Sequence, residues 1–349
     1  MLLTIIGFIL FEFRWVGLIN RFINRYQPKK NGNGKLVFPF IRKRQNRNVQ
    51  IFVYHRVNDD NDPFFPATPA DLFGKQMDYL ASHFNILSLR DAVERMRDKD
   101  VPDSALVITF DDGYRDNYVN AFPILKRLSI PATIFLTTDG IDSRRVLWHQ
   151  RVFSAFRETK LISLRDFGHD SKDYPLRTLE EKLFAQQEIL KFLRSADDGE
   201  RSLWVDRLIN LLEVEDRREV PDLMLRWDEV RDMHQSGISF GSHSVTHAIL
   251  SRLSIDKVRA EIYESKRIIE KRLGTPVTTF AYPSGRKIDF NEMTKGIVKE
   301  AGYASAVTMI FGANEYGRDL FELHRGGPWE KDLPTFAMKL NWYKFSSQG

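Results

Sequence analysis

Across most of the chain, short apolar segments typical of strands alternate with segments that have the apolar spacing of amphipathic helices. VQIFVY (49–54), ALVITF (105–110) and ATIFLTT (132–138) have the length and composition of buried strands. TPADLFGKQMDYLASH follows the helical period, and we expect Thr68 to be its N-cap and Pro69 its first helical residue. Because repeated strand–helix units form parallel sheets, we expect a barrel or a doubly wound sheet.

The alternation is interrupted over residues 143–226, which contain amphipathic helical text but no clear strand. We interpret this segment as a helical insertion between two strand–helix units rather than as a separate catalytic domain. The alternation resumes with the strand GISFGSH (237–243), a long helix that should end at Gly274, and the strands TTFAYPSG and YASAVTM.

The N-terminal segment differs from the rest in charge. Residues 1–50 carry ten Lys or Arg side chains and one acid, Glu12, which gives a net charge of +9. Since the whole chain carries +5, residues 51–349 carry −4. The basic balance therefore belongs to the N-terminal segment, and we expect no nucleic-acid partner for the body of the chain.

The same segment begins with an apolar run that Glu12 and Arg14 interrupt, well short of the roughly 20 residues that span a bilayer. It also lacks the charged start and small-residue cleavage site of a secretory signal. Aromatic and aliphatic residues interleaved with arginines favour a helix that lies on a membrane surface through residues 1–26; an ordinary helix packed on the body is the alternative. We expect a linker at 27–35, a boundary between an extension (1–48) and a domain (49–349), and a cytoplasmic protein peripheral on the membrane.

Paired carboxylates end one of the buried strands. ALVITF runs directly into Asp111 and Asp112, and adjacent like charges raise each other's pKa unless a cation or a proton is shared. The chain has no cysteine, which excludes thiolate metal sites and Cys nucleophiles. A Mg²⁺-holding strand of a nucleotide-binding protein would need a G-x-x-x-x-G-K-[ST] loop, which the sequence lacks.

Two histidines follow another strand. SFGSHSVTHAILS places His243 and His247 four residues apart, so that on a helical turn they would share a face and hold one metal ion. A carboxylate would complete a set of three ligands, and the second Asp would remain free to take a proton. The zinc-protease motif is absent because Ser244 stands where its Glu belongs. FAYPSG (280–285) ends a further strand in a turn whose backbone N–H groups could form an oxyanion hole.

Together, TFDDGY, HSVTH and FAYPSG resemble, in order and spacing, the motifs of the polysaccharide deacetylase family (carbohydrate esterase family four, the chitooligosaccharide-deacetylase homology domain) over roughly residues 49–330. FVYHRVNDD and LRWDEVRDMHQSGISFGSH resemble the branch that acts on exopolysaccharides. The resemblance implies an α/β fold, a distorted (β/α) barrel of about seven strands, with the helical insertion and the basic amphipathic extension added to it. Its site would lie at the C-terminal ends of the strands.

The resemblance also implies roles for individual residues. The metal ligands would be Asp112, His243 and His247, and the oxyanion or substrate contacts would come from Tyr282, Pro283, Ser284 and Gly285. The metal would be zinc, with cobalt or nickel as alternatives, and Asp111 would be the general base for the attacking water. A backbone N–H near Ser284 would stabilise the oxyanion together with the metal.

Three positions depart from the family pattern. Ala281 stands where many members have an Arg that orients the catalytic Asp, and Ser284 stands where an aromatic residue is usual. The general acid, normally a late His, is either His324 in LFELHRGGPW or His55 in VYHRV, and Arg325 is an alternative functional residue beside His324. The residue that orients Asp111 is therefore open.

We expect a metal-dependent hydrolase that removes N-acetyl groups from amino sugars of a polysaccharide or of a lipid-linked glycan precursor. An O-deacetylase or another amidase on the same scaffold is one alternative, and a non-catalytic carbohydrate-binding homologue is another. The complete set of Asp111, Asp112, His243 and His247 argues against the non-catalytic alternative.

Overall fold

The computed structural model describes residues 29–30, 36–37, 48–143, 145–168, 172–327, 330, 332–337 and 340. The chain divides into two compact units, Met1–Asn46 and Arg47–Gly349. In the first unit, β1 (Lys29–Lys30) pairs antiparallel with β2 (Leu36–Val37), so part of the expected linker is a strand. The helix expected over residues 1–26 lies outside the described residues.

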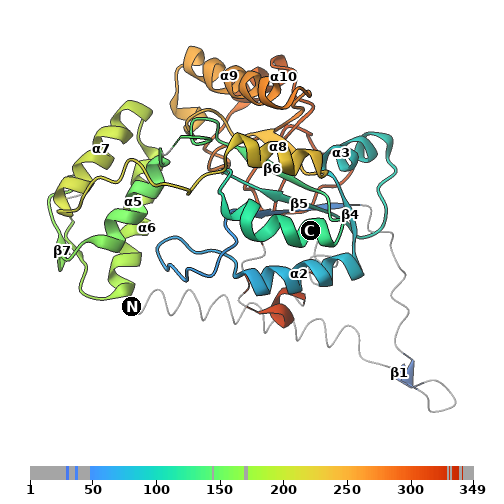
Figure 1. Ribbon diagram of the computed structural model, residues 1–349, viewed down its shortest axis with the longest axis horizontal. Helices are drawn as coiled ribbons and strands as arrows, with labels where there is room; N and C mark the ends of the chain where they lie inside the picture. Colours follow the sequence, from blue (N-terminus) through green and yellow to red (C-terminus); the bar gives the residue numbers. More distant parts are fainter. Residues whose placement is uncertain are drawn as a thin grey trace. The chain divides into compact units, whose positions relative to one another are not determined.

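The second unit is built on a parallel sheet of seven described strands (Figure 1). Their order is β11-β10-β9-β6-β5-β3, with β4 also paired to β5. The bounds are β3 (Val49–Tyr54), β4 (Asn85–Leu87), β5 (Ala105–Phe110), β6 (Ala132–Leu136), β9 (Ser239–Ser242), β10 (Thr279–Ala281) and β11 (Ser305–Val307). Strand β3 pairs along the whole of β5, whereas β4 pairs with its first half and β6 with its second half.

A late segment, residues 323–326, joins the two ends of this sheet. Leu323 bridges β11 and Gly326 bridges β3, both in parallel register. The N–H of Thr308 donates to the carbonyl of Leu323 (2.8 Å), and the N–H of Val53 donates to the carbonyl of Gly326 (3.0 Å). The sheet therefore closes on itself, and the expected distorted (β/α) barrel of about seven strands is confirmed.

Helices connect the strands of the barrel. They are α2 (Ala70–His83), α3 (Leu89–Asp98), α4 (Phe122–Arg127) after a π-helical turn η1 (Asn117–Ala121), α8 (Trp227–Gln235), α9 (Ile255–Leu273) after a 3₁₀ turn η2 (Leu250–Arg252), and α10 (Glu292–Glu300). Helix α3 packs on β4 and β5, and α9 packs on β9 between α8 and α10. Gly274 ends α9 in the left-handed conformation (φ 68°), as the sequence predicts.

Helix α2 begins one residue later than expected. Pro69 is its N-cap, and the N–H of Thr68 donates instead to the carbonyl of Arg56 (3.0 Å). The N–H of Ala70 at the helix start donates to Oδ1 of Asp59 (3.0 Å), eleven residues upstream. The cap therefore comes from a separate loop, which the local sequence of the helix does not reveal.

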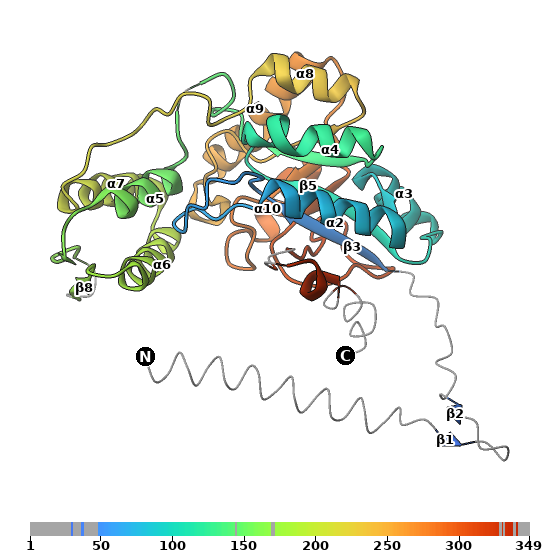
Figure 2. The ribbon, with the colours of Figure 1, turned by 60° about the horizontal axis from the view of Figure 1, so that its bottom comes forward.

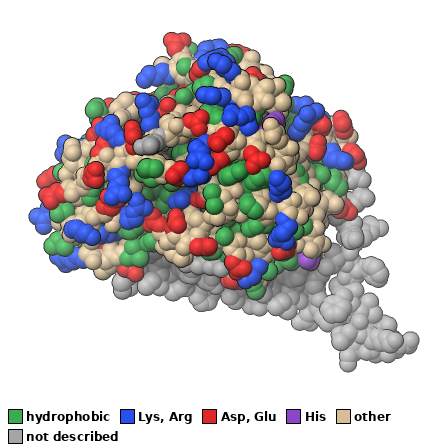
Figure 3. All heavy atoms as spheres, viewed as in Figure 1, with side chains coloured by type: hydrophobic (Ala, Val, Ile, Leu, Met, Phe, Trp, Pro, Cys, Tyr) green, Lys and Arg blue, Asp and Glu red, His purple; other side chains and the backbone are tan. Residues whose placement is uncertain are grey.

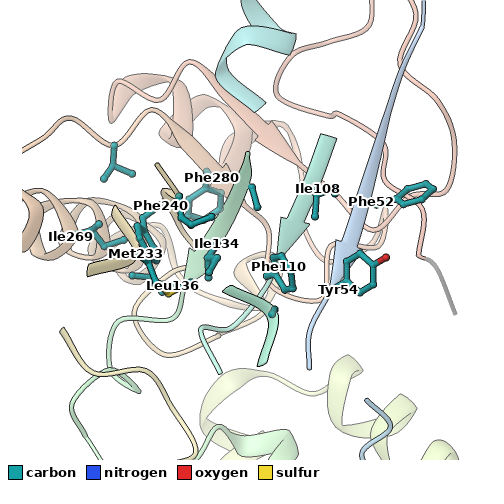
Figure 4. Packing of buried hydrophobic residues seen from close by; sticks show 14 of the residues in the cluster. Phe52, Tyr54, Ile108, Phe110, Ile134, Leu136, Met233, Phe240, Ile269 and Phe280 are labelled. Atoms are coloured by element: carbon teal, nitrogen blue, oxygen red, sulfur yellow. The ribbon is translucent and has the colours of Figure 1, made fainter. Parts of the chain in front are cut away.

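The main core lies between the sheet and these helices (Figure 4). Strand β5 is buried at all six positions, which explains its uninterrupted apolar sequence. Phe110 stacks on Tyr54 of the neighbouring β3, with ring centroids 5.5 Å apart. Each such buried side chain stabilises the fold by about 1.5–3 kcal/mol, which holds the strand ends in fixed positions.

The insertion lies between β6 and β9, as the sequence predicts. It contains α5 (Trp148–Glu158), α6 (Leu179–Ser195) and α7 (Asp198–Leu211), with a short antiparallel pair, β7 (Ser163–Leu164) and β8 (Tyr174–Pro175). Its helices pack around a separate apolar cluster that includes Phe156, Ile189, Leu193 and Leu208. Figure 2 shows α5, α6 and α7 grouped together beside the sheet.

The surface carries both signs of charge. On the face seen in Figure 3, Lys and Arg side chains alternate with Asp and Glu side chains rather than gathering in one patch. Among the described residues, no helix combines the length and the apolar character that crossing a bilayer requires.

Candidate metal and catalytic site

The site forms where neighbouring strands end. Asp111 and Asp112 follow β5 directly, and His243 follows β9. Because the C-terminal ends of parallel strands meet at one edge, these side chains come together in one pocket of about 380 Å³. The pocket is lined by His55, Phe65, Asp111, Asp112, Trp148, His149, Phe153, Arg194, His243, His247, Ser284, Arg286 and Met309.

Asp112, His243 and His247 bring three ligand atoms to one point. Oδ1 of Asp112 lies 3.3 Å from Nε2 of His247 and 3.5 Å from Nε2 of His243, and the three atoms all lie within 4.8 Å of one another. Nδ1 of His243 lies 2.8 Å from the carbonyl oxygen of Ala281. Since a carbonyl can only accept, Nδ1 carries the proton and Nε2 presents its lone pair.

The electrostatics of these three residues fit a cation. Burial lowers the pKa of His243 to about 4 and that of His247 well below its ordinary value, so both are neutral ligands at pH 7. Burial, and next the charge of Asp111, raise the pKa of Asp112 to about 8. Oδ1 of Asp112 is buried and accepts no hydrogen bond from the described residues. A divalent cation would satisfy this oxygen and favour the ionised carboxylate, so the donor set fits a metal.

The HSVTH segment is a turn rather than the helical turn that we expected. Ser244 and His247 both have left-handed backbone conformations (φ 64° and 60°). The N–H of His247 donates to Oγ of Ser244 (3.1 Å), and Glu261 of α9 accepts the N–H groups of Val245 (2.7 Å) and Thr246 (2.9 Å). The two histidines therefore converge because this turn folds back, with Glu261 holding its tip.

The adjacent carboxylates separate because the chain turns sharply between them. Asp112 has a φ of 71° and Gly113 a φ of 85°. A Cβ at Gly113 would lie 2.9 Å from Cδ2 of Leu136, so this position requires glycine. Asp112 therefore faces the histidines while Asp111 faces Arg325, and the two charges have different partners.

Arg325 is the partner of Asp111 that the sequence left open. Its Nη1 donates to Oδ1 (2.8 Å) and its Nη2 donates to Oδ2 (2.7 Å), with both residues almost fully buried. Burial raises the pKa of the Asp111 carboxyl, but the charge and hydrogen bonds of Arg325, together with the charges of His243 and His55, outweigh this effect, and the pKa falls to about 2. Arg325 also donates to Oγ1 of Thr109 (3.2 Å) and to the carbonyl of Thr308 (2.8 Å), which fixes the guanidinium. It lies on the segment that closes the barrel.

The two candidate general acids lie in different places. His324 precedes Arg325 and faces away from the pocket, where its Nε2 lies 3.2 Å from Nη1 of Arg318. The structure therefore does not bring His324 together with the other candidates. His55 lines the pocket. Burial lowers the pKa of His55, with Asp111 opposing this shift and Arg325 adding to it.

Only part of FAYPSG reaches the pocket. Ser284 lines it, with a φ of 59°. The N–H of Gly285 donates to the carbonyl of Pro283 (2.7 Å), so it is already used within the turn. Tyr282 is buried, and its hydroxyl donates to the carbonyl of Phe321 (3.0 Å). Of the four predicted contacts, Ser284 lines the pocket, and Tyr282, Pro283 and Gly285 are not among the lining residues.

The insertion forms one wall of the pocket. Trp148 and His149 of α5 and Arg194 of α6 line it. The rings of His149 and His247 are 4.9 Å apart, and burial lowers the pKa of His149 to about 3. His149 is buried, and its Nε2 lies 3.3 Å from the hydroxyl of Tyr114. The helical text around it contains no signal of its neighbour.

Comparison with known proteins identifies one matching family and individual relatives of the chain. The family described as polysaccharide deacetylase matches residues 98–306. YxkH of Bacillus subtilis, whose name provisionally calls it a polysaccharide deacetylase, is 23% identical over 288 residues, 82% of this chain and 73% of that protein. The poly-β-1,6-N-acetyl-D-glucosamine N-deacetylase of Staphylococcus epidermidis is 26% identical over 174 residues, 48% of this chain and 58% of that protein.

Solved structures share the fold. The deacetylase PplD of Streptococcus pyogenes, in complex with acetate, has a TM-score of 0.56 at 20% identity, over 84% of this chain and 97% of that chain. IcaB of Ammonifex degensii has a TM-score of 0.54 at 16% identity, over 86% of this chain and 98% of that chain. At these identities the likeness concerns the barrel and its connections.

Proposed function

Because this chain belongs to the polysaccharide deacetylase family, as its three motifs predict, we propose that it is a metal-dependent hydrolase that removes N-acetyl groups from amino sugars of a polysaccharide or of a lipid-linked glycan precursor. The observation that carries the proposal is the convergence of Asp112, His243 and His247 in one pocket with Asp111. The name of the Staphylococcus epidermidis relative supports an N-acetylated glycan as the substrate.

Asp112, His243 and His247 would hold a divalent cation, zinc or alternatively cobalt or nickel. When bound, such an ion supplies Lewis-acid chemistry: it polarises the acetyl carbonyl and makes water a better nucleophile at neutral pH. The neutral imidazoles and the tautomer of His243, fixed by the Ala281 carbonyl, prepare the two nitrogen ligands.

Asp111 would take the proton of the attacking water. It is ionised at neutral pH because Arg325 keeps its pKa at about 2. The two parallel hydrogen bonds from Arg325 fix both carboxylate oxygens, and Oδ2 lies 3.9 Å from Nε2 of His243, beside the ligand set. Arg325 thus acts as a positioning residue for the base.

His55 and Ser284 would complete the reaction. As water adds to the acetyl carbon, the N–H of Ser284 would donate to the oxygen that gains negative charge. The proton that Asp111 takes from water would then reach the sugar nitrogen by way of His55 as the C–N bond breaks, so that both residues return to their starting state. The products are acetate and a free amine on the sugar.

The test is acetate release by the purified full chain from N-acetylated oligosaccharides with β-1,4 and β-1,6 linkages. The assay is run with and without a chelator, and zinc, cobalt or nickel is then added back to the chelated protein. The Asp111→Asn variant is assayed under the same conditions. We expect chelator-sensitive release that the variant lacks. Release from O-acetylated glycans alone would favour an O-deacetylase, and no release from any acetylated glycan would favour a carbohydrate-binding homologue.

For the N-terminal segment we propose that residues 1–26 bind the cytoplasmic face of a membrane, where a lipid-linked sugar would be the substrate. The support is the sequence pattern of aromatic, aliphatic and arginine residues. Deleting residues 1–34 should abolish binding to vesicles that contain anionic lipid while leaving acetate release from soluble oligosaccharides intact. Unchanged vesicle binding would contradict this proposal.

A further inference from the structure

Arg194 is a half-buried arginine on the pocket wall, and the described residues include no ionic partner for its side chain. It lies in the last turn of α6 and lines the pocket together with the metal-ligand candidates. Within the described part of the chain, Arg194 makes no hydrogen bond and no ion pair. A half-buried guanidinium usually has a carboxylate or carbonyl partner, because its five N–H donors lose water on burial.

The carboxylate nearest in charge effect to Arg194, that of Asp289, already pairs with another arginine. Arg286 is the other cation on the lining, and its Nε and Nη2 both donate to Asp289 (2.8 Å each). Asp289 also accepts the N–H of Arg286 (2.9 Å), so this carboxylate is fully engaged. Burial, and next the charge of Arg286, lower the pKa of Arg194, with Asp289 opposing them in part.

The remaining carboxylates of the pocket are also committed. Asp111 is paired with Arg325, and Asp112 faces the two histidines. The negative end of the α6 dipole favours a basic residue in the last turn by about 0.3–1 kcal/mol. The helix dipole does not explain why Arg194 faces the pocket. A basic side chain can also lie on the solvent side of α6, as Lys191 does three residues earlier.

We propose that Arg194 binds a negatively charged substituent of the glycan, a carboxylate or a phosphate, so that the protein prefers acidic acetylated sugars over neutral ones. This inference rests on the proposed deacetylase function and adds to it the charge class of the substrate. Trp148 also lines the pocket and would contact a sugar ring there.

The test uses three fully N-acetylated tetrasaccharides with one backbone: N-acetylated chitotetraose (called chitotetraose below), its 6-carboxylated form and its 6-phosphorylated form. Binding is measured by calorimetry to the full chain carrying Asp111→Asn, so that no turnover occurs. The same titrations are made with Arg194→Gln, Arg194→Lys and Lys191→Gln added to that background. Lys191→Gln is the matched control, because it removes the same charge from the solvent side of the same helix.

We expect at least one charged form to bind about tenfold to hundredfold tighter than chitotetraose, as for hydrogen bonds to charged groups. Arg194→Gln should remove that preference, Arg194→Lys should keep part of it, and Lys191→Gln should leave it unchanged. The carboxylated and phosphorylated arms distinguish the two sources of charge.

Equal binding of all three sugars would overturn the proposal. An equal loss on all three in Arg194→Gln would also overturn it and place Arg194 against a group that they share. These outcomes are independent of catalysis: if the unsubstituted chain releases no acetate, the deacetylase proposal fails while the charge preference is still decided by binding.

Discussion

Among the described residues, the barrel and the helical insertion each contain an arginine that is no more than 2% exposed, and the two have different partners. In the barrel, Arg325 is 1% exposed and donates two hydrogen bonds to the carboxylate of Asp111. In the insertion, Arg201 is 2% exposed and donates to the carbonyls of Leu193 and Ala196 at the end of α6, and to Asp198. Burial of a charge is therefore a poor sign of function by itself.

The difference lies in what each arginine's partner faces. Asp111 lines the pocket, so Arg325 holds a group that is free to act on a ligand. Arg201 ties the end of α6 to α7 and packs over the ring of Trp148 (5.4 Å), so it supports the wall that carries Arg194. In the proposals above, the barrel would supply the reacting groups, and the insertion, which forms one wall of the pocket, would select the ligand.

The largest expected effect is the difference in activity between two aspartate substitutions, one in the barrel and one in the insertion. Asp111→Asn should lower kcat/KM for acetate release by about 10²–10⁴, because the proton acceptor is lost. Bound metal, measured by elemental analysis, should stay stoichiometric, since the ligand set is intact. Asp206→Asn in the insertion breaks partly exposed contacts to Arg151 and Arg218 and should change the rate less than about twofold. Similar losses in both variants would contradict the division of roles.

Substitution of the two buried arginines should also lower the free energy of unfolding by different amounts. Arg325→Met leaves the Asp111 carboxylate buried and unpaired, which should cost about 3–5 kcal/mol in urea unfolding at pH 7. Arg201→Met should cost about 1.5–3 kcal/mol, because Asp198 is 37% exposed and can regain water.

The effect of Arg325→Met should depend on pH. The folded pKa of Asp111 lies below its unfolded value, so its contribution is present above about pH 4 and is lost as pH falls toward 2. The stability difference between Arg325→Met and the unsubstituted chain should shrink over that range. A difference that does not change with pH would mean that Asp111 is not the group left unpaired.

Substitutions of two pocket histidines, His55 and His149, should differ less in their effect on kcat. His55→Asn should lower kcat by about 10², at the lower end of general-acid contributions. His149→Asn should lower it less than tenfold, because Nε2 of His149 lies 3.3 Å from the hydroxyl of Tyr114 and we assign His149 no proton transfer. The measurement is the pH profile of kcat for both variants. A larger loss in His149→Asn would move the acid to the insertion.

The smallest effect concerns the pH dependence of metal binding. Because the pKa of Asp112 is raised to about 8, a proton competes with the ion below that pH. Apparent zinc affinity should rise about tenfold per pH unit from pH 6 to 7.5 and level off near pH 9, with about one proton released per ion at pH 7. His149→Asn should keep the same slope, and a slope that vanishes would contradict the assignment of Asp112.

The sequence predicts the parts of the site that depend on local pattern. Strand β5 and the pairs Asp111–Asp112 and His243–His247 could be placed, because ends of parallel strands gather at one edge. The role of Arg325 could not be assigned from LFELHRGGPW, since nothing local marks which side of that segment faces inward. Its contact with Asp111 spans 214 positions of sequence and depends on how the barrel closes.

The same reason explains two other residues that the sequence does not reveal. Glu261 holds the HSVTH turn from a helix whose own sequence shows only an exposed charged face. His149 reaches the ring of His247 because α5 of the insertion packs beside the strand ends. In each case the contact is set by the packing of whole elements, and no motif spans the two partners.

The closing segment 323–326 has a consequence for how the protein is made. During synthesis the chain leaves the ribosome from its N-terminus, so β5 and its two carboxylates emerge long before Arg325 does. Until that late segment is threaded between β11 and β3, Asp111 has no buried counterion and the barrel has two open edges. We therefore expect the pocket to form late in folding, and a chain that ends before residue 323 should lack the pair of Asp111 with Arg325.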